Sequence, residues 1–113
     1  MMVLVYFILI RWLREERNYN DFNTMIYQIY NLVSIAIKKN IIIFNLRKFL
    51  GLDIEIQTKL IEINYKFFYP KKRYLRYKKI LEIVKNVHKQ SKKTYNLASM
   101  NIEIKEDSII FKN

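Results

Sequence analysis

Two stretches of alternating apolar and polar residues restrict the fold of this chain more than any other feature. Residues 61–67 alternate strictly over seven positions, and residues 54–57 alternate over four. A period of two places every apolar side chain on one face of an extended strand. We therefore predict a β-hairpin whose strands are residues 53–57 and 61–67, with Lys59 at the tip.

The same region also fits a second interpretation. Residues 44–53 are similar to the middle of a helix-turn-helix, with Gly51 at the corner and Asp53 capping a recognition helix. That helix would present Glu55 and Glu62 to DNA, whose phosphates repel carboxylates. The hairpin is therefore favoured, and a helix-turn-helix DNA-binding regulator is kept as the alternative.

Apolar periodicity predicts the other elements. Residues 3–10 form a continuous apolar run of strand length, and residues 21–39 repeat apolar positions every three or four, as an amphipathic helix does. Pro70 suits the first position of a second helix, which either continues to Val87 or gives way to a strand near residues 83–88. Further segments of strand or turn type lie at residues 40–44, 94–104, 106–108 and 109–111.

This order of elements predicts an α+β fold, a mostly antiparallel β-sheet with two helices packed on one face. At 113 residues, 51% of them apolar, the chain is expected to form one domain over residues 1–113 with its own core. The apolar segment 1–13 falls well short of the ~20 residues that span a bilayer, so a buried strand is favoured there.

The sequence contains no arrangement of residues that predicts catalysis. His88 is the only histidine and there is no cysteine, which excludes the usual zinc sites and a pair of histidines. The paired acids of residues 15–16 and 106–107 are more simply solvated charges, and no glycine-rich phosphate loop is present. We therefore predict a protein that is not an enzyme, with no cofactor, no metal and no small-molecule substrate. His88 is expected to be a structural or surface residue.

Positive charge is concentrated in one segment. Residues 70–93 contain ten Lys or Arg and one acid, Glu82, a net of +9 out of +11 for the whole chain. So many uncompensated cations repel one another unless a polyanion binds them. Arg73 and Arg76 offer bidentate contacts to phosphate, and the interleaved Tyr74 and Tyr77 could stack on bases. Taken singly, each of these two tyrosines is expected to be packed rather than stacked on a base.

At these residues the chain resembles a known family, the eukaryotic large-subunit ribosomal protein number twenty-two. The family has a segment reading K-R-Y-L-K-Y, and residues 72–77 here read Lys-Arg-Tyr-Leu-Arg-Tyr. Residues 90–97 fit the family pattern N-S-K-x-S-Y-x-L, and residues 41–51 are similar to a segment that ends at Gly51. The basic hairpin tip of the family would correspond to residues 58–59, and its glycine-rich loop is reduced here to Gly51.

The resemblance implies a structural constituent of the cytoplasmic large ribosomal subunit, bound to ribosomal RNA and to neighbouring ribosomal proteins. A membrane-peripheral basic protein using residues 1–13 is a further alternative. The residues expected to contact RNA are Lys59, Lys71, Lys72, Arg73, Tyr74, Arg76, Tyr77, Lys78, Lys79, Lys89, Lys92 and Lys93.

Overall fold

The computed structural model describes residues 21–71, 77–89 and 93–113. The expected strand at residues 3–10 lies outside these ranges. In chain order the elements are α2 (Asp21–Val33), β1 (Ser34–Ile37), β2 (Ile41–Asn45), α3 (Leu46–Leu50), α4 (Ile54–Phe68), α5 (Tyr77–Lys89), β3 (Thr94–Leu97), β4 (Met100–Lys105) and β5 (Ser108–Lys112).

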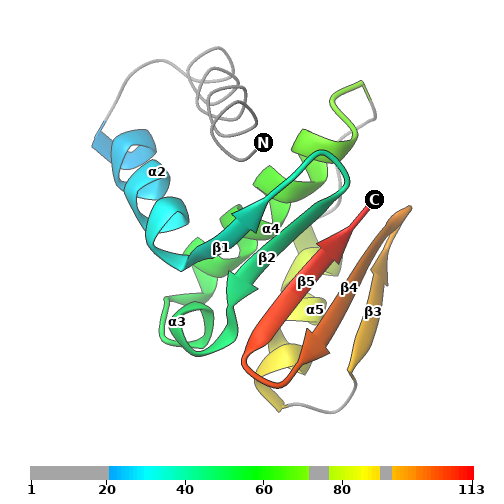
Figure 1. Ribbon diagram of the computed structural model, residues 1–113. Helices are drawn as coiled ribbons and strands as arrows, with labels where there is room; N and C mark the ends of the chain where they lie inside the picture. Colours follow the sequence, from blue (N-terminus) through cyan, green and yellow to red (C-terminus); the bar gives the residue numbers. More distant parts are fainter. Residues whose placement is uncertain (1–20, 72–76, 90–92) are drawn as a thin grey trace.

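The five strands form one antiparallel sheet in the order β1-β2-β5-β4-β3 (Figure 1). Strands β3, β4 and β5 form a meander through two-residue turns, and β2 pairs with β5, for example at Phe44 and Ile109. Burial alternates along the strands of this sheet. Ile42, Phe44 and Phe111 are fully buried, while their neighbours in the same strands are partly buried or exposed.

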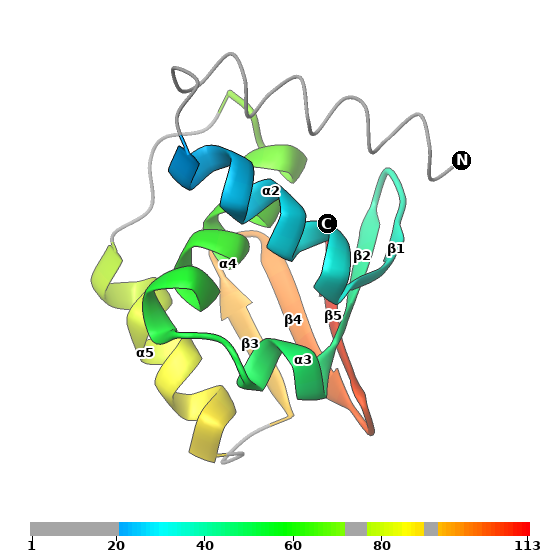
Figure 2. The same ribbon diagram turned by 90° about the vertical axis from the view of Figure 1, so that its left-hand side faces the viewer.

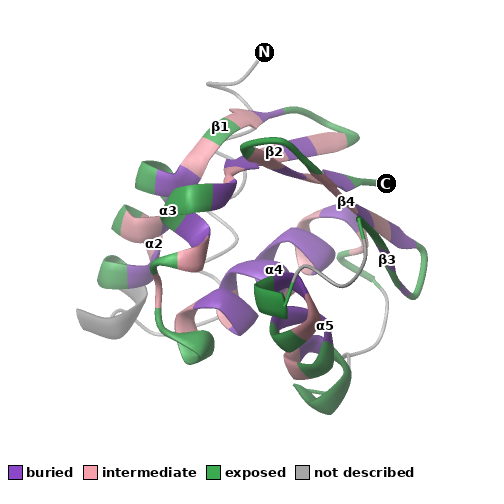
Figure 3. Cartoon of the chain, turned by 90° about the horizontal axis from the view of Figure 1, so that it is seen from below, coloured by how far each residue is buried: buried purple, intermediate pink, exposed green. Residues whose placement is uncertain are grey.

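The helices lie on one face of the sheet (Figures 2 and 3). Helices α4 and α5 pack against each other, and α2 contacts both α3 and α4. The buried side chains of the sheet and of the helices form one hydrophobic cluster. The expected α+β class, with a mostly antiparallel sheet and helices on one face, is confirmed.

The hairpin expected at residues 53–67 is wrong, because Ile54–Phe68 is the helix α4. The hairpin prediction assumed that the polar residues of the alternating pattern face solvent. In the fold Gln57 and Asn64 are fully buried, whereas Ile54 is 42% exposed. Helix α4 is covered by α5 and α2 as well as by the sheet, so its buried face is too wide to show a simple helical stripe.

The helix expected over residues 21–39 ends earlier than predicted. Helix α2 stops at Val33, and Ser34–Ile37 forms the edge strand β1 instead. Ile37 pairs with Ile42 of β2, so strand pairing overrides the helical spacing of these residues. Lys38 and Lys39 therefore lie in the turn between β1 and β2 rather than in a last helical turn.

The remaining elements follow the expectations except for the start of the second helix. Pro70 was expected at its first position, but Pro70 and Lys71 form a turn, and the described part of α5 begins at Tyr77. Helix α5 continues to Lys89, which settles the choice between helix and strand at residues 83–88 in favour of the helix. Strand β2 covers the run expected at residues 40–44, and β3, β4 and β5 cover the expected extended segments. Glu106 and Asp107 form the expected turn between β4 and β5.

Candidate nucleic-acid interface

Helix α5 buries one side and exposes the other. Its buried residues, Ile80, Ile83, Val84 and Val87, recur at intervals of three, one and three. This spacing places all four on one side of the helix, toward the core. The opposite side is therefore left to charged residues.

A row of charged residues runs along that opposite side. Lys78, Glu82, Lys85 and Lys89 are all exposed and are spaced by four, three and four positions, which spans about 16 Å of helix. Lys79 is exposed beside the row. We call Lys78, Lys79, Lys85 and Lys89 the lysine face. Within the described residues no ion pair involves any of the four.

A buried glutamine connects α5 to two other helices. Gln57 of α4 is fully buried, and its Oε1 lies 2.9 Å from Nε2 of His88 in the last turn of α5. Its Nε2 donates to the carbonyl of Phe49 in α3 at 2.6 Å. One side chain thus joins three helices. His88 is exposed and has this structural contact, in agreement with its expected role.

Two more of the expected cations flank α5 in the chain. Lys71 is exposed in the turn that follows α4, and Lys93 is exposed just before β3. The carbonyl of Lys93 accepts a hydrogen bond from the backbone N–H of Ile104 at 2.7 Å, which attaches this residue to the sheet. Cations therefore precede, line and follow the helix.

Six of the twelve expected residues are exposed on α5 or in the described segments before and after it in the chain: Lys71, Tyr77, Lys78, Lys79, Lys89 and Lys93. Five others lie outside the described residues: Lys72, Arg73, Tyr74, Arg76 and Lys92. Lys85 belongs to the lysine face but was not among the expected contacts. The sequence could have predicted Lys85 as well, because it lies seven positions after Lys78 and residues seven apart share a helix face.

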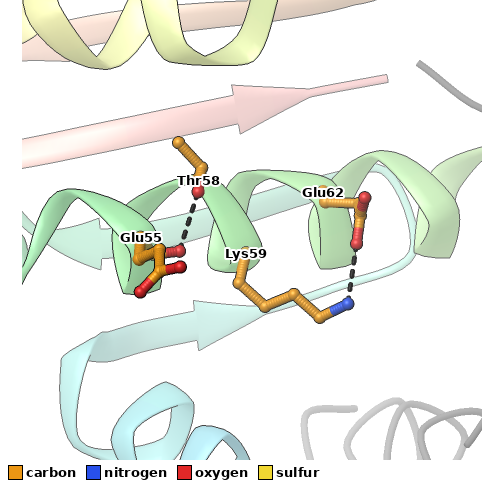
Figure 4. A network of polar contacts seen from close by, with 4 residues as sticks. All are labelled: Glu55, Thr58, Lys59 and Glu62. Carbon is orange, nitrogen blue, oxygen red and sulfur yellow. Dashed lines mark hydrogen bonds and ion pairs between the residues drawn. The ribbon is translucent and has the colours of Figure 1, made fainter. Parts of the chain in front are cut away.

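Lys59 is not at a hairpin tip (Figure 4). It lies in the middle of α4, and its Nζ is 2.8 Å from a carboxylate oxygen of Glu62. Its side chain is only 13% exposed. The hairpin position that motivated Lys59 as an RNA contact therefore does not exist. The correspondence between residues 58–59 and the hairpin of the ribosomal family fails for the same reason.

Tyr77 also differs from expectation. It was expected to pack, but it is 53% exposed at the start of the described part of α5. The buried side of the helix is already occupied by aliphatic residues, so the ring remains at the surface beside Lys78.

The helix-turn-helix interpretation is correct about the local backbone and wrong about the exposed surface. Helices α3 and α4 are joined through Gly51, whose N–H donates to the carbonyl of Arg47. Asp53 occupies the N-cap position of α4, but its side chain makes no capping hydrogen bond. Eight residues of α4 are buried, and only Ile54 and Glu55 of this helix are exposed, while the others are partly buried. A recognition helix has to present polar side chains to the major groove, and α4 does not.

The described part of the chain has no group of three or more His, Cys, Asp or Glu residues that could hold a metal ion. None of the helices that the structure describes is both long and apolar enough to cross a membrane. No protein-family model, no curated protein and no solved structure matches this chain.

Proposed function

We propose that the protein binds RNA and that the lysine face of α5 contacts the phosphate backbone. The observation that carries this proposal is the row of exposed lysines opposite a buried aliphatic stripe, with Glu82 as its one acid. Lysines without ion-pair partners raise the local positive potential and attract a polyanion. Lys71 and Lys93, exposed in the segments before and after α5 in the chain, add to the positive charge of this region.

The contact is electrostatic in this mechanism. Each ammonium group approaches a phosphate and releases a counter-ion, so binding weakens as salt rises. The packing of α5 on the core and the contact between Gln57 and His88 keep the backbone of the helix in place, so only the lysine side chains have to be ordered on binding. Arg73 and Arg76, which precede α5, would add bidentate phosphate contacts.

The resemblance at residues 72–77 extends the proposal to ribosomal RNA of the large subunit, with neighbouring ribosomal proteins as further partners and the cytoplasm as the location. This extension rests on the resemblance alone, and helix α4 replaces the hairpin of that family. Sedimentation of a tagged protein tests it. Co-migration with large subunits after a high-salt wash supports the extension, and absence from them defeats it.

A charge-neutralising variant tests RNA binding itself. Lys78→Gln, Lys85→Gln and Lys89→Gln are combined, and affinity for a labelled stem-loop RNA is measured by fluorescence anisotropy at several salt concentrations. If each lysine neutralises one phosphate, the log–log salt slope should fall by about 2–3 in magnitude. Circular dichroism should not change, since all three side chains are exposed.

The matched control removes the same charge elsewhere. Lys38, Lys39 and Lys105 are exposed and lie outside α5, in the β1–β2 turn and at the end of β4. Their combined change to Gln should leave the slope nearly intact. Equal losses in both variants would mean that only net charge matters, and the proposed site would be wrong. Tighter binding of duplex DNA than of RNA at equal salt would favour the DNA-binding alternative.

A further inference from the structure

The exposed ring of Tyr77 is not explained by phosphate binding. Five large apolar residues of the described chain are exposed, and Tyr77 is the one aromatic among them. Its ring makes no contact with another described aromatic ring. Tyr30, in contrast, is buried and donates its hydroxyl hydrogen to Asn64.

The helix places this ring at one edge of the lysine face. Residues four and eleven positions apart share a side of a helix, so Tyr77 lies on the same flank as Leu81 and His88. His88 contacts Gln57, so this flank adjoins α4. The row that begins at Lys78 lies about 100° around the helix. The ring therefore borders the row at its Lys78 end, on the flank opposite Lys79, where a strand whose phosphates follow the row can bring a base to it.

Such a ring recognises a base face. Flat aromatic side chains stack on nucleobases whatever the base, and neighbouring cations hold the backbone. In an A-form duplex the base faces are stacked on one another and cannot accept a side chain, whereas loops, bulges and single strands present them. We infer that Tyr77 stacks on an unpaired base, so that the RNA is bound at a single-stranded segment or loop. This inference rests on the proposed RNA binding.

Removing the ring tests the inference. Affinity is measured for a hairpin RNA with an open loop and for a blunt duplex with the same number of nucleotides. Tyr77→Ala should weaken binding to the open loop roughly 5- to 150-fold and leave the duplex unchanged. Tyr77→Phe keeps the ring and should bind the loop within about threefold of the original protein. The salt slope should not change in either variant, because no charge is removed.

Two control variants separate stacking from simple exposure of apolar surface. Tyr77→Leu keeps an apolar side chain but has no ring, so it should lose loop binding as Tyr77→Ala does. Leu32→Ala changes another exposed apolar residue, 66% exposed on α2, and should have no effect. Because Tyr77 is half exposed, circular dichroism should show all of these variants folded.

The possible failures are distinguishable. If the lysine variant loses RNA binding but Tyr77→Ala binds loop and duplex normally, the inference is wrong and the proposed function stands. If Tyr77→Ala weakens both RNAs equally, the ring supports α5 rather than a base, and the inference is again wrong. If the original protein shows no salt-dependent binding to either RNA, the proposed function itself has failed.

Discussion

The contact between Gln57 and His88 leads to a prediction about coupled substitutions. His88→Leu places an apolar side chain beside Gln57 and removes the N–H group that donates to its Oε1. Gln57 is fully buried, so this oxygen would lose its partner, and the free energy of unfolding should fall by about 1–2 kcal/mol.

Replacing the other residue of the pair, Gln57, lowers stability for a different physical reason. Gln57→Met removes both hydrogen bonds but leaves no buried polar atom at this position. The carbonyl of Phe49 still accepts the N–H of Leu52 at 3.1 Å, and the exposed His88 can bond to water. The expected loss is about 1–2 kcal/mol for two net hydrogen bonds.

The double variant decides between coupling and coincidence. With Met at position 57 there is no oxygen to leave unsatisfied, so adding His88→Leu should have almost no further effect. The coupling free energy should be about 1–2 kcal/mol. Urea unfolding followed by circular dichroism measures this coupling. His88→Leu should lower the midpoint by about 0.5–1 M more in the original protein than in the Gln57→Met variant.

Lys85→Leu provides the matched control, since it changes an exposed residue of the same helix that does not contact Gln57. Its effect should be the same in both backgrounds within about 0.5 kcal/mol. If His88→Leu is also additive with Gln57→Met, then His88 does not satisfy Gln57, and the argument that this pair holds α5 is refuted.

Four further predictions concern single residues. Phe44→Ala should lower the free energy of unfolding in urea by about 3–5 kcal/mol, because the ring is fully buried and contacts three other aromatic rings. Burial raises the pKa of Tyr30 well above its ordinary value, so the unfolded chain loses this proton first and stability should fall above about pH 10. Tyr30→Phe should reduce that fall in a pH series of urea titrations. Gly51→Ala should be neutral or slightly stabilising, since Gly51 has a φ of −79° and an added Cβ would meet only ordinary contacts at 3.6 Å and beyond. Ala98→Gly should stabilise the β3–β4 turn by about 0.5–1 kcal/mol in thermal unfolding, because Ala98 has a φ of 55°.

The sequence predicted the sheet better than it predicted the helices. In β4 apolar and polar residues alternate because one face of the sheet is covered, so polarity reports burial there. Strands β2 and β5 are recognisable instead as short runs rich in β-branched and aromatic residues, although their burial also alternates. In α4 polarity fails as a guide, since Gln57 and Asn64 are buried by tertiary contacts that no local pattern contains. The end of α2 failed similarly, because Ser34–Ile37 becomes a strand only by pairing with β2.

The candidate site was predictable as far as charge determines it. The basic segment identified the helix, and Lys78, Lys79 and Lys89 are exposed as that segment suggested. The exposure of Tyr77 was not predictable, because it depends on which side of α5 the aliphatic residues occupy against the core. Lys59 failed for the converse reason, since its position was inferred from a strand pattern that tertiary packing overrides.

The position of β5 between β2 and β4 has a consequence for how the protein forms during its synthesis. Three of the four strand pairings join neighbours in the chain, but Phe44 pairs with Ile109, 65 positions later, and α3, α4 and α5 lie between them. Closing so long a loop is slow and entropically unfavourable until the pairing is made. At ordinary synthesis rates of about 5–20 residues per second, β2 waits about 3–13 s for its partner. During that interval the edge of β2 that later pairs with β5 has no hydrogen-bonding partner. This open edge can pair with a strand of another chain.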